Sequence, residues 1–319
     1  MARQTGNLNF VACLYALRHI HKRDITLLSG NALGGLGMFQ NTFHLCSPHQ
    51  IRVATTEQLR SDFLITGLFD VGQVRLHYVY QERMIVGGVM PCDRPLFLPA
   101  FDETPGGGSV AMLNRREMAV INIGMGSGTI LVDGTCYRLA RFATLYVGQG
   151  AESVCFASDD SARPAKFYLT STPAHAAFPT RHIDLSQGKL LKLGSQEQVN
   201  RRSIYQLVEP SVCPSAQLLF GLTILEPGSV WNTNPPHRHL LRSEIYLYCD
   251  MDAADRVFHF MGTPDETRHL VVRQEEAVIC PSWSIHMGAG SGRYAFVWAM
   301  GGENQDYDDI ERLSLTKLR

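Results

Sequence analysis

The chain has 319 residues, 45% of them hydrophobic and 18% charged, which is enough for two modest domains or one large one. Lysine and arginine number 29 against 30 aspartate and glutamate, and the net charge of -1 argues against a nucleic-acid-binding protein, which would carry a basic excess on one face. No apolar run reaches the roughly 20 residues that span a bilayer, so we expect no membrane partner.

The first 38 residues differ from the rest of the chain. Their apolar stretch, Leu8 to Leu17, is short and is followed by basic residues instead of a small-residue cleavage site, so we do not expect a signal peptide. The region ends in the linker-like run Gly30 to Gly37. We predict that residues 1–38 are a disordered extension; the alternative is a regulatory or oligomer-forming arm.

From about residue 60 the chain is rich in short strand patterns with turns between them. Asp133-Gly134 marks a tight hairpin, the stretch 178–202 looks polar and irregular, and Thr56–Phe63 and Asp309–Leu318 are the expected short helices. The predicted strands fall in two series: 75–80, 83–86, 119–124, 129–132, 143–147, 153–156 and 166–169, then 217–225, 244–248, 256–260, 269–272, 277–280 and 294–298. Such strands favour antiparallel barrels or sandwiches.

The eight cysteines show no Cys-x-x-Cys spacing, and several lie in apolar strand-like runs. An extracellular disulfide framework is typical of a short, cysteine-dense chain instead. We therefore expect buried free thiols in a reducing cytosol and a cytoplasmic protein.

The chemistry of the chain is concentrated in a group of three histidines and one glutamate. His237 and His239 are separated by one residue, so on a β-strand their side chains share a face. Glu244 follows five residues later and can fold back onto that face, and His286 can arrive from a distant strand. Three imidazoles and a carboxylate indicate a transition-metal site, for which zinc, iron and manganese are all suitable.

The spacing of these residues resembles the two-part signature of the cupins. His237, His239 and Glu244 fit its first motif, although Gly228 and Asp250 depart from the flanking glycine positions. Pro281 and His286 keep the spacing of its second motif, with Trp283 and Gly290 in place of the usual glycine and asparagine. The resemblance implies an all-β bicupin of two antiparallel barrels, 39–195 without metal and 196–319 with it.

A wider set of segments resembles one family, the 5-dehydro-4-deoxy-D-glucuronate isomerases, also called 4-deoxy-L-threo-5-hexosulose-uronate ketol-isomerases. The resemblance covers residues 50–319, and the segments that carry it are Ile85 to Pro91, Asn114 to Glu117, Ala174-His175, Asn200 to Arg202, Trp231 to Thr233, Glu266 to His269, Pro281 to His286 and Gly302 to Gln305.

The family resemblance implies a hexameric, cytoplasmic enzyme of pectin and uronate catabolism with one zinc ion per chain. Its zinc ligands fall on His237, His239, Glu244 and His286. The implied reaction interconverts 5-dehydro-4-deoxy-D-glucuronate and 3-deoxy-D-glycero-2,5-hexodiulosonate. Leu240 and Leu241 stand in the ligand loop at positions that are usually more polar in the family.

An aldose–ketose shift moves a proton between C1 and C2 of the substrate, so it requires a general base. Glu303, His175 and a metal-bound water are the candidates. The substrate carboxylate calls for a guanidinium group, because arginine matches a carboxylate with two parallel hydrogen bonds. Arg268, Arg202 and Arg116 are the candidates, and for each a structural salt bridge is the competing interpretation.

Two other functions stay open from the sequence. An Fe(II)-dependent cupin oxygenase would use the same ligand set, and a non-enzymatic cupin would bind a sugar without turnover. Metal analysis separates the first from a zinc isomerase, and a uronate isomerisation assay separates the second.

Overall fold

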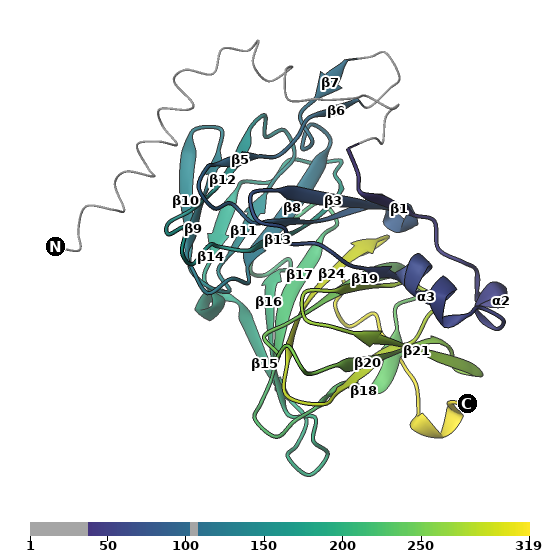
Figure 1. Ribbon diagram of the computed structural model, residues 1–319. Coiled ribbons are helices and arrows are strands. Elements are labelled where there is room, and N and C mark those ends of the chain that lie inside the picture. The colour runs from purple at the N-terminus through teal and green to yellow at the C-terminus, as the bar shows by residue number, and fades with distance from the viewer. Residues whose placement is uncertain (1–37, 103–107) are drawn as a thin grey trace.

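The computed structural model describes residues 38–102 and 108–319 (Figure 1). The predicted N-terminal extension therefore lies outside the described residues, apart from Met38. The described chain folds almost entirely into β-strands, with the two α-helices α2 (Pro48–Ile51) and α3 (Thr56–Phe63). The prediction of a β-rich fold with few short helices is confirmed. No helix in the described ranges is long and apolar enough to cross a membrane.

Strands from the first half of the chain form two sheets. Sheet I contains, in spatial order, β1 (Asn41–Phe43), β3 (Val74–Val79), β4 (Met84–Val89), β13 (Phe167–Pro173), β8 (Arg116–Asn122), β11 (Thr144–Val147) and β14 (Arg181–Ile183). Sheet II contains β10 (Thr135–Leu139), β9 (Gly128–Val132), β12 (Val154–Ser158) and β5 (Leu96–Phe97). A separate short pair joins β6 (Phe101–Asp102) to β7 (Ser109–Val110).

The second half of the chain, together with β2 (Leu64–Ile65) from the first half, forms two further sheets. Sheet III contains β15 (Lys189–Leu193), β16 (Arg202–Val208), β17 (Leu219–Leu225), β24 (Ala295–Gly302), β19 (Arg242–Cys249), β22 (Ala277–Cys280) and β2 (Leu64–Ile65). Sheet IV contains β21 (Glu266–Val272), β20 (Val257–Thr263), β23 (His286–Gly290), β18 (Trp231–Arg238) and β25 (Glu311–Arg312). Short 3-10 turns occur at η2 (Gln81–Arg83), η3 (Leu185–Gln187) and η4 (Leu315–Lys317).

Three apolar clusters fill the spaces between the sheets. One lies between sheets I and II and includes Val120 and Phe156. Another lies between sheets III and IV and includes Leu219 and Leu270. The third joins sheet I to sheet III and includes Val86, Ile121 and Ile245 among its members. Sheets I and III therefore bury both faces, which explains why their strands read as continuous apolar runs in the sequence.

The first residues of the described chain also pack on the second pair of sheets. β2 pairs with β22 and extends sheet III, although it comes from residues 64–65. Helix α3 begins with a capping box in which Thr55 and Gln58 exchange side-chain to backbone hydrogen bonds. Its buried residues Leu59 and Phe63, four apart and so on one helix face, join the cluster between sheets III and IV. Figure 1 shows α2 and α3 beside β20 and β21.

Local sequence signals predicted several of these elements correctly. The helix at Thr56–Phe63 and the strand at 277–280 have the predicted bounds. The hairpin at Asp133-Gly134 is also confirmed: it joins β9 to β10, and both of its residues have positive φ angles, of 46° and 86°. Positive φ at both central residues is what a type I′ turn requires, and it favours Asp-Gly at this place.

Two predicted elements are wrong. The predicted helix at Asp309–Leu318 is instead the strand β25 followed by the 3-10 turn η4. Pairing with β18 overrides the weak helical pattern, because Glu311 bonds to Arg238 at 2.6 Å and the Leu313 N–H donates to the Pro236 carbonyl. The stretch predicted as irregular, 178–202, contains β14 and β15; most of β15 is exposed, so backbone pairing with β16 forms it without an apolar signal.

A buried carboxylate connects sheet I to the segment that leads into β17. Glu117 on β8 is fully buried and accepts a hydrogen bond from the Tyr146 hydroxyl at 2.6 Å. It also accepts the backbone N–H groups of Ala216, Gln217 and Leu218, at 2.6 to 2.8 Å. Because a buried carboxylate accepts these three N–H groups, Glu117 stabilises the contact between the two halves of the chain.

We predict that Glu117→Gln lowers the free energy of unfolding by about 3 kcal/mol, because the amide removes the charge and turns one acceptor into a donor that faces N–H groups. Urea unfolding followed by circular dichroism measures this loss. Glu152→Gln, at an exposed position, is the matched control. An unfolding midpoint of Glu117→Gln equal to that of the wild type would contradict the assignment.

Candidate metal centre and its pocket

Three strands and one turn bring the four predicted ligands together. His237 on β18 lies directly opposite His286 on β23, in adjacent strands of sheet IV. Glu244 lies on β19 of sheet III, and His239 lies just beyond the end of β18, in the turn that leads to β19. The site thus sits between sheets III and IV, at the end where one chain reversal joins them.

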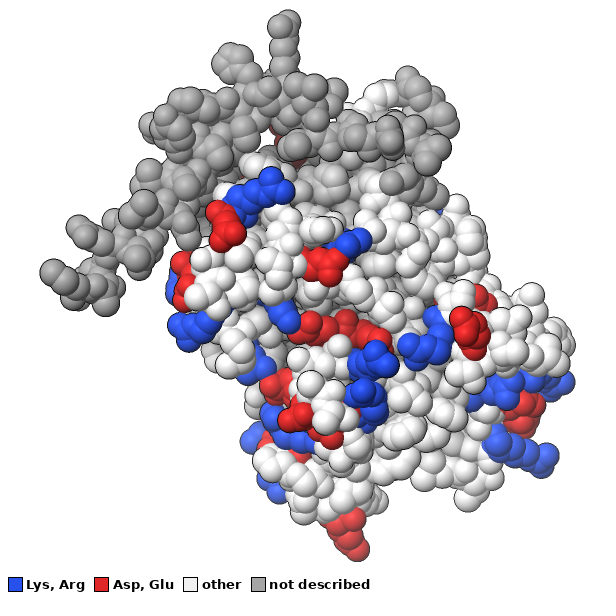
Figure 2. Space-filling model, in the orientation of Figure 1, with Lys and Arg blue, Asp and Glu red and all other residues white. Residues whose placement is uncertain are grey.

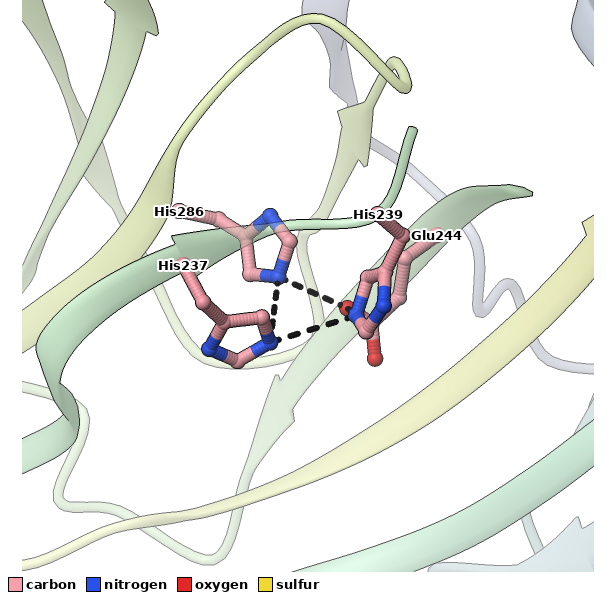
Figure 3. A group of neighbouring side chains, drawn as sticks. All are labelled: His237, His239, Glu244 and His286. Carbon is pink, nitrogen blue, oxygen red and sulfur yellow. Dashed lines mark hydrogen bonds and ion pairs between the residues drawn. The ribbon is translucent and has the colours of Figure 1, made fainter. Parts of the chain in front are cut away.

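The four side chains point toward a common centre (Figure 3). The Nε2 atom of His237 is 3.0 Å from that of His286 and 3.2 Å from that of His239. The Oε2 atom of Glu244 is 3.0 Å from His286 Nε2 and 3.4 Å from His239 Nε2. Zinc–nitrogen bonds of about 2.1 Å in a tetrahedral site place neighbouring ligand atoms about 3.4 Å apart, so the cluster has the size of a metal coordination shell.

Electrostatics in the cluster also fit a cation. Glu244, His239 and His286 are almost completely buried. Burial, with the neighbouring His286 and His239 as smaller causes, holds the pKa of His237 well below its usual range. Burial opposes ionisation of Glu244, but its contacts with His239 and His286 outweigh this effect and lower its pKa. A carboxylate beside a neutral imidazole, with lone pairs that converge, is a donor set that a divalent metal ion satisfies.

A pocket opens next to these residues and is lined by both sheets. His237, His239 and Glu244 form part of its wall. The remaining wall contains polar side chains that could contact a sugar acid and apolar ones that exclude water: Arg202, Thr233, Tyr246, Tyr307 and Arg312 are polar, and Ile204, Phe296, Trp298 and Met300 are apolar.

Arg202 is the predicted carboxylate-binding residue that lies in this pocket. Its guanidinium group donates one hydrogen bond, of 2.8 Å, to the carbonyl of Asn200. Within the described ranges no carboxylate forms an ion pair with it, and burial lowers its pKa. A half-buried guanidinium with unused donors, next to the cluster of three histidines and Glu244, is suited to bind an anionic ligand.

The other two predicted arginines bind backbone carbonyls elsewhere. Arg268 donates to the carbonyls of Ile51, Arg52 and Ala54, at the end of helix α2. Arg116 is buried in sheet I and donates to Ser171 and to the carbonyl of Arg83. Neither arginine lines the pocket beside the histidines.

The two predicted general bases also lie outside the pocket wall. Glu303 is exposed just after β24, where its backbone N–H donates to the Leu241 carbonyl. His175 is exposed in the loop after β13, in the first half of the chain. Neither contacts the four clustered side chains, and both stay predictions.

Sequence reasoning missed several polar residues of the pocket, among them Tyr246, Tyr307 and Arg312. Tyr246 follows Glu244 by two positions on β19, so period-two alternation places it on the same face, and this signal was present in the sequence. Tyr307 and Arg312 belong to the C-terminal segment. The sequence pattern there predicted a helix, so the strand β25 at the edge of the pocket was missed.

Comparisons with known proteins show which proteins this chain is similar to. A sequence profile described as the KduI/IolB family matches residues 103–313. The chain is 50% identical over 272 residues to 4-deoxy-L-threo-5-hexosulose-uronate ketol-isomerase 1 of Rhizobium meliloti strain 1021, covering 85% of this chain and 96% of that relative. It is 48% identical over 273 residues to 4-deoxy-L-threo-5-hexosulose-uronate ketol-isomerase of Lachnoclostridium phytofermentans, covering 86% and 98%.

Among solved structures, the crystal structure of an IolB-like protein from Salmonella typhimurium matches with a TM-score of 0.63. The alignment covers 79% of this chain and 96% of that one at 13% sequence identity. At this identity the match concerns the fold and not the ligand.

We predict that His237→Ala loses most bound metal, because it removes one of four converging donors. Metal content per chain, measured by elemental analysis after gel filtration, tests this. The control is His269→Ala, which changes an exposed histidine on β21 that lies outside the cluster. Full metal content in folded His237→Ala would show that the cluster is not the metal site.

Proposed function

The chain belongs to the KduI/IolB family, and we propose that it is a ketol-isomerase that converts 5-dehydro-4-deoxy-D-glucuronate to 3-deoxy-D-glycero-2,5-hexodiulosonate. Relatives of 44–50% identity that carry the name of this activity support the proposal. The structural observation that carries it is the pocket that places a metal-type cluster and the half-buried Arg202 together. The substrate has a carbonyl group, which a metal held by the cluster would polarise, and a carboxylate, which Arg202 would bind.

We propose zinc as the metal, with one ion per chain held by His237, His239, Glu244 and His286. The family resemblance favours zinc, while the donor set would also accept iron or manganese. When bound, such an ion supplies a Lewis acid that polarises a carbonyl oxygen.

Within the pocket the protein side chains would hold the substrate in one direction. We propose that Arg202 binds the carboxylate, because its free N–H donors match two carboxylate oxygens. This places the aldehyde end of the sugar toward the histidine cluster. The hydroxyl groups of Thr233, Tyr246 and Tyr307 are the donors and acceptors available to the sugar hydroxyls. The apolar wall, with Phe296 and Trp298, excludes water and strengthens these polar contacts.

We propose further that the four sheets form two cupin barrels, with a division near residues 195 and 196. Sheets I and II would make the first barrel, without a metal, and sheets III and IV the second. Two strands from before this division, β2 and β15, extend the second barrel.

A homohexamer in the cytoplasm is the assembly and location that the family resemblance favours. Cys46, Cys92, Cys213, Cys249 and Cys280 are free thiols, in keeping with a reducing compartment. Gel filtration with light scattering measures the assembly directly.

An isomerisation assay with 5-dehydro-4-deoxy-D-glucuronate tests the activity. We expect turnover by the zinc-loaded protein and loss of turnover after chelation. Activity that requires Fe(II) and consumes oxygen would instead indicate a cupin oxygenase. Binding of the uronate without turnover would indicate a sugar-binding protein.

A pair of arginine variants tests the carboxylate site. We predict that Arg202→Met lowers kcat/KM about ten- to a hundred-fold, mainly through KM, since a charge-assisted hydrogen bond is worth roughly 1.5–3 kcal/mol. Arg268→Met removes the alternative candidate and should lower stability, because three carbonyls at the end of α2 lose their donor. The reverse result, normal kinetics for Arg202→Met and a raised KM for Arg268→Met, would assign the carboxylate to Arg268.

A further inference from the structure

Arg242 is among the largest fully buried side chains of the described residues. It opens β19, two residues before Glu244 and three after His239. Its guanidinium group donates to the backbone carbonyls of Asp306 and Asp309. In the described part of the chain no carboxylate forms an ion pair with it. Burying a guanidinium without such a partner is costly, so this arrangement calls for an explanation beyond packing.

The carbonyl of Asp309 is shared between Arg242 and a metal-site histidine. The Nδ1 atom of His239 lies 3.1 Å from this oxygen, and one guanidinium nitrogen of Arg242 lies 3.1 Å from the same oxygen and 3.1 Å from Nδ1 itself. When Nδ1 carries the proton, the ring and the guanidinium, which can only donate, both donate to the Asp309 carbonyl. For Nε2 of His239 to bind a metal, the ring must carry its proton on Nδ1, where the Asp309 carbonyl accepts it. Partners of this kind fix the orientation of a metal-bound imidazole.

Asp309 belongs to a segment that also forms one wall of the pocket. We call residues 304–313 the C-terminal wall, since Tyr307, Ile310 and Arg312 within it line the pocket. The side chain of Asn304 holds that of Asp309 at 2.7 Å. At the other end, Glu311 and Arg312 pair with β18, the strand that carries His237.

We propose that Arg242 is a positioning residue that couples the two parts of the site: it fixes the Asp309 carbonyl, and through it both His239 and the C-terminal wall. Loss of Arg242 should therefore weaken metal binding and loosen the pocket wall together. The expected effect on metal binding rests on the proposed function, whereas the expected effect on the C-terminal wall rests only on contacts within the chain.

The competing interpretation is that Arg242 only contributes to stability. Two measurements separate this interpretation from a positioning role. A residue that only contributes to stability would change neither measurement in the folded protein. The first is the zinc dissociation constant, measured with the zinc ion alone and a competing chelator. The second is hydrogen–deuterium exchange of the backbone in residues 304–313, measured without metal.

The test uses Arg242→Met and Arg242→Lys in the full chain. We expect Arg242→Met to weaken zinc binding about ten- to a hundred-fold and to speed exchange in the C-terminal wall. Lysine can reach one of the two carbonyls, so Arg242→Lys should recover part of both effects. The matched control is Arg293→Met, which removes an arginine that donates to the Leu225 carbonyl and pairs with Asp250, outside the pocket.

A milder variant keeps the test decisive if Arg242→Met does not fold. Asn304→Ala removes the side-chain hydrogen bond that holds the Asp309 carboxylate, and it should shift both readouts in the same direction by a smaller amount. Wild-type zinc affinity and wild-type exchange in folded Arg242→Lys and Asn304→Ala would overturn the inference. Failure of the wild-type protein to bind zinc would instead overturn the proposed metal, and the exchange readout would still decide the role of Arg242 in the wall.

Discussion

The burial of both faces of β19 is the constraint on which the rest of this structure depends. Ile245 and Leu247 point to the apolar cluster that joins sheets I and III. Glu244 and Tyr246 alternate with them and therefore point between sheets III and IV. A shift of one residue in register would bury Glu244 in the apolar cluster between sheets I and III, and it would direct its neighbours on β19 into the pocket. The contact between the two halves of the chain thus fixes the direction of the carboxylate in the site.

The two sheet pairs differ in what they bury, and this difference locates the chemistry. Between sheets I and II the interior is mainly an apolar cluster, and buried polar residues of these sheets, such as Arg116 and Ser171, bond to each other and to backbone carbonyls. Between sheets III and IV the interior also holds Glu244, His286 and His259, the last hydrogen-bonded to Tyr248. Buried polar groups reduce stability unless each finds a partner, so they persist where they serve binding or catalysis. The first pair supplies a rigid support instead, against which β19 is held.

The sequence was sufficient to predict which four side chains converge, because their grouping depends largely on short-range rules. His237 and His239 are related by strand periodicity, and Glu244 follows after a short turn, so local spacing placed three of the four. The arginines could not be ranked in the same way. Arg202, Arg268 and Arg116 each lie at or near a strand end, and only the tertiary structure separates the one in the pocket from those that bind backbone carbonyls.

The C-terminal segment shows why some long-range features escape sequence reasoning. Its residues have no alternating apolar pattern, and β25 exists only because β18 offers an unpaired edge. Yet this short strand brings Arg312 to the pocket and leaves Asp309 beside His239 and Arg242. Such a segment is specified by its partners and not by its own composition. Its backbone carbonyls contact His239 and Arg242, while the side chains of Asn304 and Glu311 hold the segment in place, so both kinds of contact maintain the geometry of the site.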